Sequence, residues 1–469
     1  MDKDNIIMKS LNLTPDKVQS LKTAFADGVV HIYITLKDSR PQCDLCGCSD
    51  NIVILNYSDR TYHHLDLFGH PSRIHWHRRR FRCKDCGHTY SEPNIFGPET
   101  YQMTYAVLDR IVTALRNPRK TFRDVARDYH VSHSLVQIYA DSFIRVPRQY
   151  LPENLGIDEI HSDMAKYGGS YLCVFVDNKH RCLNEILPNR SKATLSRHFE
   201  TIPLAERNKV KYVTIDMWES YKEVCLKYLK NCEIAVDPFH VVKHLSDGFS
   251  RLRIDIMNQA PKGSSVYYLL KSWHKLLETD YDLDNTPKYN SFFRMKMNYR
   301  DLYDMLLNIN PDLSLAYQLK EMYRDFNRDA TEKDCEARFN QIYEAFVEAD
   351  LPCYSEFIAL LQHWKPEILN SFKRPYQDRK QSNALAENIN SQLRVLINVS
   401  NGYANFERFR ARALFCFNPY ITFSLTQHLS SNKREGRTRG SYNKHTNSVF
   451  DDTRPEYEDD GPDDSSEEE

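Results

Sequence analysis

The chain has 469 residues, of which 41% are hydrophobic and 27% charged, a balance that excludes collagen, a coiled coil and a wholly disordered protein. It contains no apolar run of roughly 18 residues, so we expect no membrane span, and its first residues lack the apolar core of a signal peptide. Eleven acidic residues and one arginine give Asp451–Glu469 a charge of −10, which leaves +9 on residues 1–450 of a chain whose net charge is −1. A basic body suits a polyanionic partner, whereas an acidic end tract is typical of a solvated tail.

Apolar patterning and prolines predict an α/β protein of seven segments. Residues 1–40 form an N-terminal segment with one expected strand, Val29–Leu36, and are followed by a cysteine-bearing module at 41–95 and by helices at 104–146. A β-rich first part of a core at 153–240 and its C-terminal part at 375–425 enclose a helical insertion at 241–374. Apolar content then collapses, and we expect residues 430–469, basic first and then acidic, to be disordered.

Two Cys-x-x-Cys-Gly units stand in the second segment. Two thiolates three positions apart in a tight turn can face one ion, and the following glycine lets the backbone curl towards the sulfurs. Two such knuckles predict one structural zinc ion, although the spacer between them is longer than in the simplest ribbons, and Cys48 and His88 are alternative ligands. Ordinary core cysteines or a redox pair are the competing interpretations. The predicted zinc ligands are Cys43, Cys46, Cys83 and Cys86.

The stretch between the knuckles, Arg73–Arg82, holds five arginines and no acid. Ile74 and Trp76 alternate with polar positions, as in a half-buried strand. Cationic side chains on such a strand suit DNA phosphates, while a merely solvated charged strand is the alternative. The arginines expected to contact DNA are Arg78, Arg79, Arg80 and Arg82.

A pair of helices is expected inside residues 104–146. Thr121 and Asp124 have the spacing of a capping box, and Ser132 or Ser134 can cap a second helix after a short break. In a DNA-binding helix-turn-helix the second helix enters the major groove, whereas such pairs are also common in plain helical cores. The side chains expected to face DNA are His133, Ser134 and Gln137.

The β-rich segment predicts the order of a ribonuclease H-like catalytic core. Three strands, a helix, a strand, a helix and a strand follow one another in the chain. In that architecture the first and fourth strands are neighbours, so Asp158 and Asp216 would lie side by side. The expected strands are 155–160, 171–177, 181–187, 210–216 and 232–237, and the first helix is 191–199.

Adjacent carboxylates repel each other unless a cation lies between them, and hard oxygen ligands suit Mg²⁺ or Mn²⁺. A third acid, Glu387, lies in a predicted helix whose polar stripe also contains Asn383, Asn390 and Arg394. That face can combine a ligand for a two-metal site with a phosphate contact from Arg394. The alternative is that acids at strand ends are solvated caps.

Four motifs in order resemble the DDE transposases of bacterial insertion sequences, specifically the ISL-three group. They are Gly156-Ile-Asp-Glu159, Thr214-Ile-Asp-Met-Trp-Glu-Ser-Tyr221, Asp237-Pro-Phe-His240 and Ser382-Asn-Ala-Leu-Ala-Glu-Asn-Ile-Asn390. The knuckle pair is similar to that group's zinc-binding region, and the similarity runs from about residue 40 to 425.

This resemblance implies a ribonuclease H-like fold and a metal-binding triad of Asp158, Asp216 and Glu387. The 170 residues between the last two are then a helical insertion in the core. For Asp237 and His240 both a direct chemical role and a supporting role stay open, and Asn383 and Asn390 are further supporting candidates.

The sequence therefore predicts a transposase with two catalytic Mg²⁺ or Mn²⁺ ions and one Zn²⁺. It would bind double-stranded DNA, both the inverted repeats of its own element and the target, as a homodimer that pairs two ends at the bacterial nucleoid in the cytoplasm. Its chemistry would be cleavage by activated water, followed by attack of the freed 3′-hydroxyl on target DNA. The rival hypotheses are a non-catalytic DNA-binding regulator and a structure-specific nuclease on the same fold.

Overall fold

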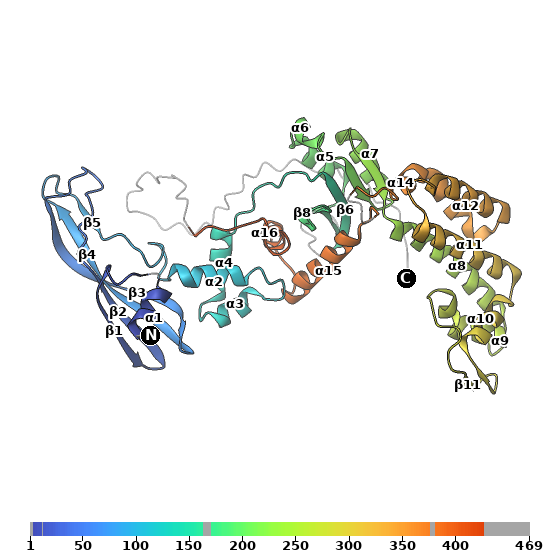
Figure 1. Cartoon of the computed structure of the whole chain (residues 1–469), viewed down its shortest axis with the longest axis horizontal. Helices are drawn as coiled ribbons and strands as arrows, with labels where there is room; N and C mark the ends of the chain where they lie inside the picture. The colour runs from blue at the N-terminus through green and yellow to red at the C-terminus, as the bar shows by residue number, and fades with distance from the viewer. Residues whose placement is uncertain (1–2, 12, 163–169, 376–379, 426–469) are drawn as a thin grey trace, which may run out of the picture. The chain divides into compact units, whose positions relative to one another are not determined.

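The computed structural model describes residues 3–11, 13–162, 170–375 and 380–425 (Figure 1). The predicted disordered tail at 430–469 lies outside these residues. Nowhere in the described ranges is there a helix long and apolar enough to cross a membrane.

A helix and a five-stranded sheet form the N-terminal part. The strands run in the order β1-β2-β4-β3, with β5 pairing with β4, and β2 and β4 are parallel while the other neighbours are antiparallel. Ile32, Ile74 and Trp76 pack in the core between sheet and helix, so the alternation predicted around Trp76 is confirmed. The expected strand Val29–Leu36 is confirmed with those bounds. The elements are α1 (Lys3–Ser10), β1 (Val18–Ala26), β2 (Val29–Leu36), β3 (Ile52–Leu67), β4 (His70–Cys83) and β5 (Thr89–Ser91).

Three helices follow: α2 (Tyr105–Ala114), α3 (Phe122–Asp128) and α4 (His133–Phe143). The predicted capping box is present, because Thr121 Oγ1 accepts from the Asp124 N–H while the Asp124 carboxylate accepts from the Thr121 N–H. Of the two serines considered, Ser132 caps α4 by accepting from the Leu135 N–H. Side-chain caps of this kind satisfy the first free N–H groups of a helix, so each start is fixed locally.

The central sheet has the strand order β10-β9-β6-β7-β8. β6, β7 and β8 form an antiparallel meander, while β9 and β10 run parallel to β6. The first and fourth strands of this segment are therefore neighbours, as predicted. The strands are β6 (Asn154–His161), β7 (Tyr171–Asp177), β8 (Cys182–Leu187), β9 (Tyr212–Ile215) and β10 (Glu233–Val236).

The connections and the C-terminal half are mostly helical, as expected, with one short hairpin in the insertion. The helices between the strands are α5 (Lys192–Glu200), α6 (Leu204–Arg207) and α7 (Glu219–Tyr228). The insertion contains α8 (Pro238–Gln259), α9 (Ser265–Ser272), η2 (His274–Leu277), β11 (Lys288–Asn290), β12 (Met295–Met297), α10 (Tyr299–Leu307), α11 (Pro311–Asp329), α12 (Cys335–Ala349), η3 (Pro352–Tyr354), α13 (Ser355–His363) and α14 (Lys365–Asn370). The last helices are α15 (Ala384–Val399) and α16 (Phe406–Phe417).

Each face of the central sheet packs in a different core. On one face, Leu155, Ile157 and Phe175 join α5, α7 and the insertion in one apolar cluster. On the other face, Ile160 and Val174 join α15, α16 and also α2–α4 in a second cluster. The helices at 104–146 therefore share a core with the sheet, and α15 and α16 contact β6 and β8.

Candidate functional site

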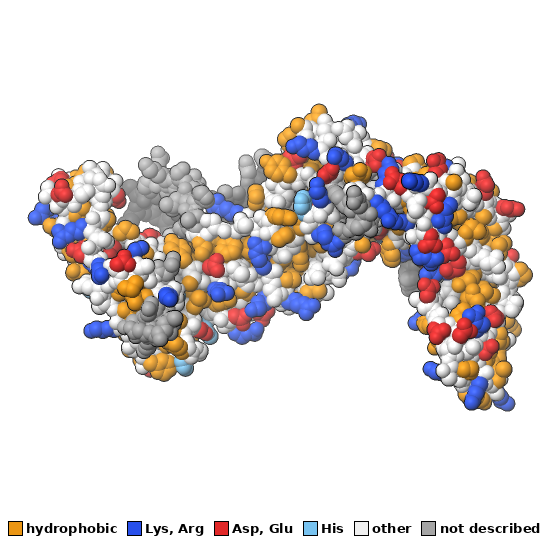
Figure 2. All heavy atoms as spheres, in the orientation of Figure 1, with side chains coloured by type: hydrophobic (Ala, Val, Ile, Leu, Met, Phe, Trp, Pro, Cys, Tyr) orange, Lys and Arg blue, Asp and Glu red, His pale blue; other side chains and the backbone are white. Residues whose placement is uncertain are grey.

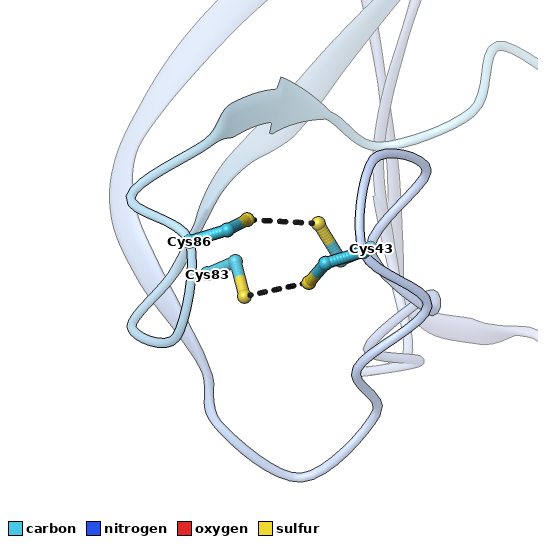
Figure 3. A group of neighbouring side chains, drawn as sticks. Cys43, Cys83 and Cys86 are labelled. Atoms are coloured by element: carbon cyan, nitrogen blue, oxygen red, sulfur yellow. Dashed lines mark hydrogen bonds between the residues drawn. The ribbon is translucent and has the colours of Figure 1, made fainter.

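The four cysteines of the two knuckles come together beside the N-terminal sheet. Cys43 Sγ lies 3.7 Å from Cys86 Sγ, and Cys46 Sγ lies 3.6 Å from Cys83 Sγ. Figure 3 labels Cys43, Cys83 and Cys86, whose side chains lie in this cluster. Gly47 and Gly87 have φ values of +76° and +75°, the left-handed conformation that a glycine adopts without strain. The predicted role of the glycine after each knuckle is confirmed.

The donor set fits zinc in chemistry and in size. All four sulfurs lie within 4.8 Å of one another. Tetrahedral Zn–S bonds of ~2.3 Å place neighbouring sulfurs about 3.8 Å apart, close to the two separations above. The N–H groups of residues 46 and 45 lower the pKa of the Cys43 thiol to about 7, and those of Cys86 and Asp85 lower the pKa of Cys83. These two shifts favour the thiolate, the form that binds metal.

The second cysteine of each knuckle is shifted the other way. The Cys48 N–H lowers the pKa of Cys46, but the neighbouring Cys86 thiol and burial outweigh it and raise the pKa to about 12. The His88 N–H lowers the pKa of Cys86, but burial outweighs it and raises the pKa.

The two alternative ligands are less well placed. The His88 ring pairs with Asp44, with Nε2 3.0 Å from a carboxylate oxygen. Cys48 groups with Cys83 and Asp85 rather than with all four sulfurs. The four knuckle cysteines are therefore the more compact set.

Arg78 and Arg79, two of the four arginines predicted to contact DNA, are instead buried and paired within the protein. Arg79 is 2% exposed, and its Nη1 donates to Glu92 Oε1 at 3.1 Å. Arg78 is also buried and makes two bonds to the Glu99 carboxylate, at 3.0 and 2.6 Å. A buried guanidinium requires such partners, because its desolvation is costly.

Arg80 and Arg82 are exposed. Arg80 Nη2 donates to Thr89 Oγ1, and no contact holds the Arg82 guanidinium among the described residues. The arginine-rich strand therefore divides into a structural half and an exposed half. The alternation of apolar and polar residues along β4 does not show which arginines are buried, because the acids that pair with Arg78 and Arg79 follow later in the chain.

Helix α4 presents only part of its predicted binding face. His133 and Ser134 are exposed. Gln137, however, lies against Arg408 of α16, with its amide oxygen 2.9 Å from Nη2 in one of the two amide orientations. The Arg408 guanidinium also makes two bonds to Asp141, at 3.0 and 2.8 Å. Gln137 thus has a protein partner from a distant part of the sequence.

Three aspartates lie in a row across the parallel half of the central sheet. In the β6–β9 register Gly156 is opposite Thr214, and continuing this register places Asp158 opposite Asp216. The β9–β10 register places Asp237 next to Asp216 in the same way. Neighbouring strands are ~4.8 Å apart, so the carboxylates form one continuous acidic edge, with Asp158 within β6 and Asp216 and Asp237 directly after β9 and β10. All three aspartates are buried.

The start of α15 lies directly over β6. A Cβ atom at Gly156 would lie 2.5 Å from Val176 Cγ2 and 3.3 Å from Asn383 Oδ1, so only glycine fits this close approach. Asn383 Nδ2 donates to the Ile157 carbonyl at 2.9 Å. The glycine of the Gly-Ile-Asp-Glu motif therefore has a packing role next to the acid.

Two amides hold the helix that carries Glu387 against the aspartates. Asn390 Nδ2 donates to Asp158 Oδ2 at 2.8 Å, and the Asn383 N–H donates to Asp237 Oδ1 at 3.2 Å. Residues 383, 387 and 390 share one helical face, so the Glu387 side chain also faces the acidic edge. Arg394, further along α15, is exposed.

The Glu387 carboxylate lies close to Asp237 and His240. One ligand atom from each of these three residues lies within 4.8 Å of the others. His240 Nε2 in turn lies 3.0 Å from Asp216 Oδ1, a separation that suits an ion pair although the angles are not those of a hydrogen bond. Asp237 and His240, which the sequence left open between two roles, are thus in contact with the predicted triad.

The electrostatics of this edge fit a cation. Burial, followed by the charge of Asp216, raises the pKa of Asp158 to about 7, and burial raises the pKa of Asp237 to about 6. Burial lowers the pKa of His240, but Asp216 and the nearby acids outweigh it and raise the pKa overall. Within the described ranges no lysine or arginine pairs with the three aspartates. Oxygen ligands with excess negative charge are what Mg²⁺ and Mn²⁺ prefer.

A second group next to the aspartates was not predicted. Arg190 Nη1 donates to Glu159 Oε1 at 2.6 Å, and Tyr221 Oη donates to Glu159 Oε2 at 3.2 Å. The guanidinium carbon of Arg190 also lies 4.0 Å from the centre of the Trp218 ring and 4.4 Å from the centre of the Tyr171 ring. This network ties β6 to the loop after β9. The Trp and Tyr of the Thr214–Tyr221 motif were its only signal in the sequence.

Both regions of the chain are similar to known transposases. Residues 155–413 match a transposase family model, that of the ISL3 group, and residues 39–86 match the zinc-finger of transposase IS204/IS1001/IS1096/IS1165. The chain is 25% identical over 392 residues to the transposase for insertion sequence element IS1001 of Bordetella parapertussis, a match that covers 80% of this chain and 88% of that protein. Because the transposase model covers more than half of the sequence, the chain belongs to the ISL3 family of transposases.

Proposed function

We propose that this transposase binds the terminal inverted repeats of its own insertion sequence and catalyses metal-dependent strand cleavage and strand transfer. The observation that carries the proposal is the row of buried aspartates across the neighbouring strands β6, β9 and β10, with Glu387 held over it by α15. The strand order and the mixed parallel and antiparallel pairing support a ribonuclease H-like core. The helices between β10 and α14 are then an insertion in that core.

In this proposal Asp158, Asp216 and Glu387 hold divalent cations. When bound, two such ions activate water and stabilise the leaving 3′ oxygen. Asn390 fixes the Asp158 carboxylate, and His240 partly balances the charge of Asp216. No protein nucleophile is needed, because the freed 3′-hydroxyl of the DNA attacks the target. The chain's own contribution is placement of charge in a buried edge, where electrostatic effects are strong.

DNA recognition is assigned to the N-terminal half. The zinc module would hold Arg80 and Arg82 against phosphates, and α3 and α4 would act as a helix-turn-helix with His133 and Ser134 at the DNA. Arg394 would make a further phosphate contact beside the catalytic edge. Pairing of two element ends favours a homodimer, working on the nucleoid of a bacterial cytoplasm.

The test is cleavage and joining of end-bearing DNA in Mg²⁺ or Mn²⁺. Asp158→Asn, Asp216→Asn and Glu387→Gln should each lower the rate by about 100-fold or more while end binding stays at the parent level. Glu223→Gln is the matched control, because Glu223 is an exposed acid on α7 that pairs only with Lys192 among the described residues. A triad variant that joins ends at the parent rate would disprove the assignment.

The rival functions predict different results from the same assay. A non-catalytic regulator would bind ends without any metal-dependent cleavage. A structure-specific nuclease would cut DNA but leave the 3′ end unjoined. The acidic edge argues against the regulator, since buried unpaired carboxylates are costly unless they bind a cation.

A further inference from the structure

A basic cavity separates α3 and α4 from the loop between α15 and α16. Its volume is about 400 Å³. The lining comes from both sides, with Lys120, Arg123 and His133 from the helical segment and Arg408 and Arg412 from one face of α16. No Asp or Glu is among the lining residues. Lysine and arginine side chains are also exposed over α15 and α16 on the face drawn in Figure 2.

Arg412 is a buried cation that pairs with no carboxylate among the described residues. It is 3% exposed, and its Nη2 donates to the carbonyls of Asn117 and Lys120, at 3.1 and 2.9 Å. Its Nε and Nη1 have no hydrogen-bond partner within the described ranges. The Phe122 ring lies 5.8 Å from its guanidinium carbon. The Cys416 thiol is also near: burial raises the pKa of this thiol, and the charge of Arg412 opposes the rise.

Two further cations of the cavity are already balanced. Lys120 Nζ lies 2.8 Å from Asp128, and Arg408 pairs with Asp141. Arg123 is exposed and no described carboxylate pairs with it. Arg123 and Arg412 therefore leave the cavity with excess positive charge. An unpaired buried charge is strongly unfavourable, so an anion that completes the site would be bound with a large electrostatic gain.

We propose that this cavity binds a phosphate of the DNA backbone at the exposed Arg123, with the unpaired charge of the buried Arg412 behind it. The proposal rests on the proposed function, which supplies DNA as the polyanion. Phosphate is the class of ligand indicated, because guanidinium groups bind its oxygens in a planar, two-pronged geometry. The site joins the predicted DNA-binding helices to the segment that carries the catalytic glutamate.

The cavity lies at the far end of the helix that bears Glu387. From Glu387 to Val399, which lines the cavity, α15 rises about 18 Å at ~1.5 Å per residue. That length corresponds to roughly five base pairs of B-form DNA at ~3.4 Å each. The cavity would therefore contact the strand at least about that far from the phosphodiester at the acidic edge.

The first experiment compares Arg123→Ala with Arg119→Ala in the full chain. Both arginines are exposed and four positions apart, but Arg119 does not line the cavity. Binding of a short random-sequence duplex is titrated at several salt concentrations without divalent metal. Arg123→Ala should reduce the slope of log K against log salt by about one, while Arg119→Ala should match the parent. Equal slopes for both variants would overturn the proposal.

The second experiment addresses the buried arginine and the source of the phosphate. Sodium phosphate should raise the melting temperature of the parent above its value in sodium chloride of equal ionic strength, and Arg412→Gln should lose this rise. Arg412→Lys, which keeps the charge, should retain part of it and controls for misfolding. Phosphate should also compete with the duplex in the parent but not in Arg123→Ala. A phosphate effect without such competition would overturn the assignment to DNA.

These outcomes separate the cavity from the catalytic proposal. If the parent binds no DNA, the proposed function fails. If the parent binds DNA but the cavity variants have the same salt slope and the same response to phosphate as the parent, the cavity proposal fails and the proposed function stands.

Discussion

The thiol cluster and the acidic edge are assembled in different ways. Each half of the thiol cluster is a single turn, in which the backbone of residues 43–48 or 83–88 closes on itself. The acidic edge draws its side chains from β6, from the ends of β9 and β10, and from α8 and α15, and Asn383, the cap of α15, is bonded to Ile157, 226 residues earlier in the chain. One site depends on local spacing, and the other depends on the topology of the whole core.

The two regions also treat charge differently. In the N-terminal sheet the buried Arg79 has Glu92 as a partner, so the charges are balanced within the protein. At the acidic edge Asp158, Asp216 and Asp237 have only His240 as a cationic neighbour within the described ranges. Buried charges that are paired within the protein stabilise the fold. Buried charges without a partner lower its stability but favour binding of a ligand of opposite charge. Removing a residue should therefore have opposite effects on stability in the two regions.

The largest effect is expected in the thiol cluster. Cys43→Ser removes one of the four sulfur ligands and should abolish binding of about one Zn²⁺ per chain. The module should then lose much of its stability, because metal binding to a structural thiolate site supplies ~10 kcal/mol or more of folding free energy. Metal analysis of the purified protein measures the loss, and limited proteolysis should show cleavage within residues 41–95.

Cys48→Ser is the matched control for that experiment. Cys48 lies in the same turn but outside the group of four sulfurs. Equal zinc content in the two variants and the parent would show that the knuckles are not a zinc site.

The same contrast explains what the sequence could and could not predict. The knuckles, the Thr121 capping box and the strand Val29–Leu36 depend on residues a few positions apart, so their patterns were sufficient. The neighbouring first and fourth strands followed from the order of elements. These features needed no knowledge of which distant side chains meet.

Burial by distant partners was not predictable. Arg78 and Arg79 were expected at the surface, yet both are buried and pair with Glu99 and Glu92, which follow later in the chain. Gln137 was expected to face DNA, but Arg408 reaches it from α16. A cationic run or a polar helix position indicates surface exposure only when no later segment supplies a partner.

The second effect tests the balanced charge in the N-terminal sheet. Arg79→Ala should destabilise this region by about 3–5 kcal/mol, because it leaves the buried Glu92 carboxylate without its cation. The neighbouring Arg80→Ala should leave stability within ~0.5 kcal/mol, since Arg80 is exposed, but should weaken DNA binding. Thermal and chemical denaturation measure the first difference and a binding titration the second. Similar stability losses in both variants would contradict the division of the strand.

The smallest expected effect has the opposite sign and concerns the acidic edge. Asp158→Asn removes one of three neighbouring buried carboxylates while keeping the shape that accepts the bond from Asn390, once its amide is turned. In metal-free buffer the variant should therefore be more stable than the parent, by about 1–2 kcal/mol, because repulsion and burial of charge are relieved. Adding Mg²⁺ should raise the melting temperature of the parent more than that of Asp158→Asn, since a ligand stabilises the state that binds it. Glu223→Gln, at an exposed acid, should show neither change. If Asp158→Asn were instead destabilised as strongly as Arg79→Ala, the charges of the acidic edge would be balanced within the protein, and the contrast between the two regions would be lost.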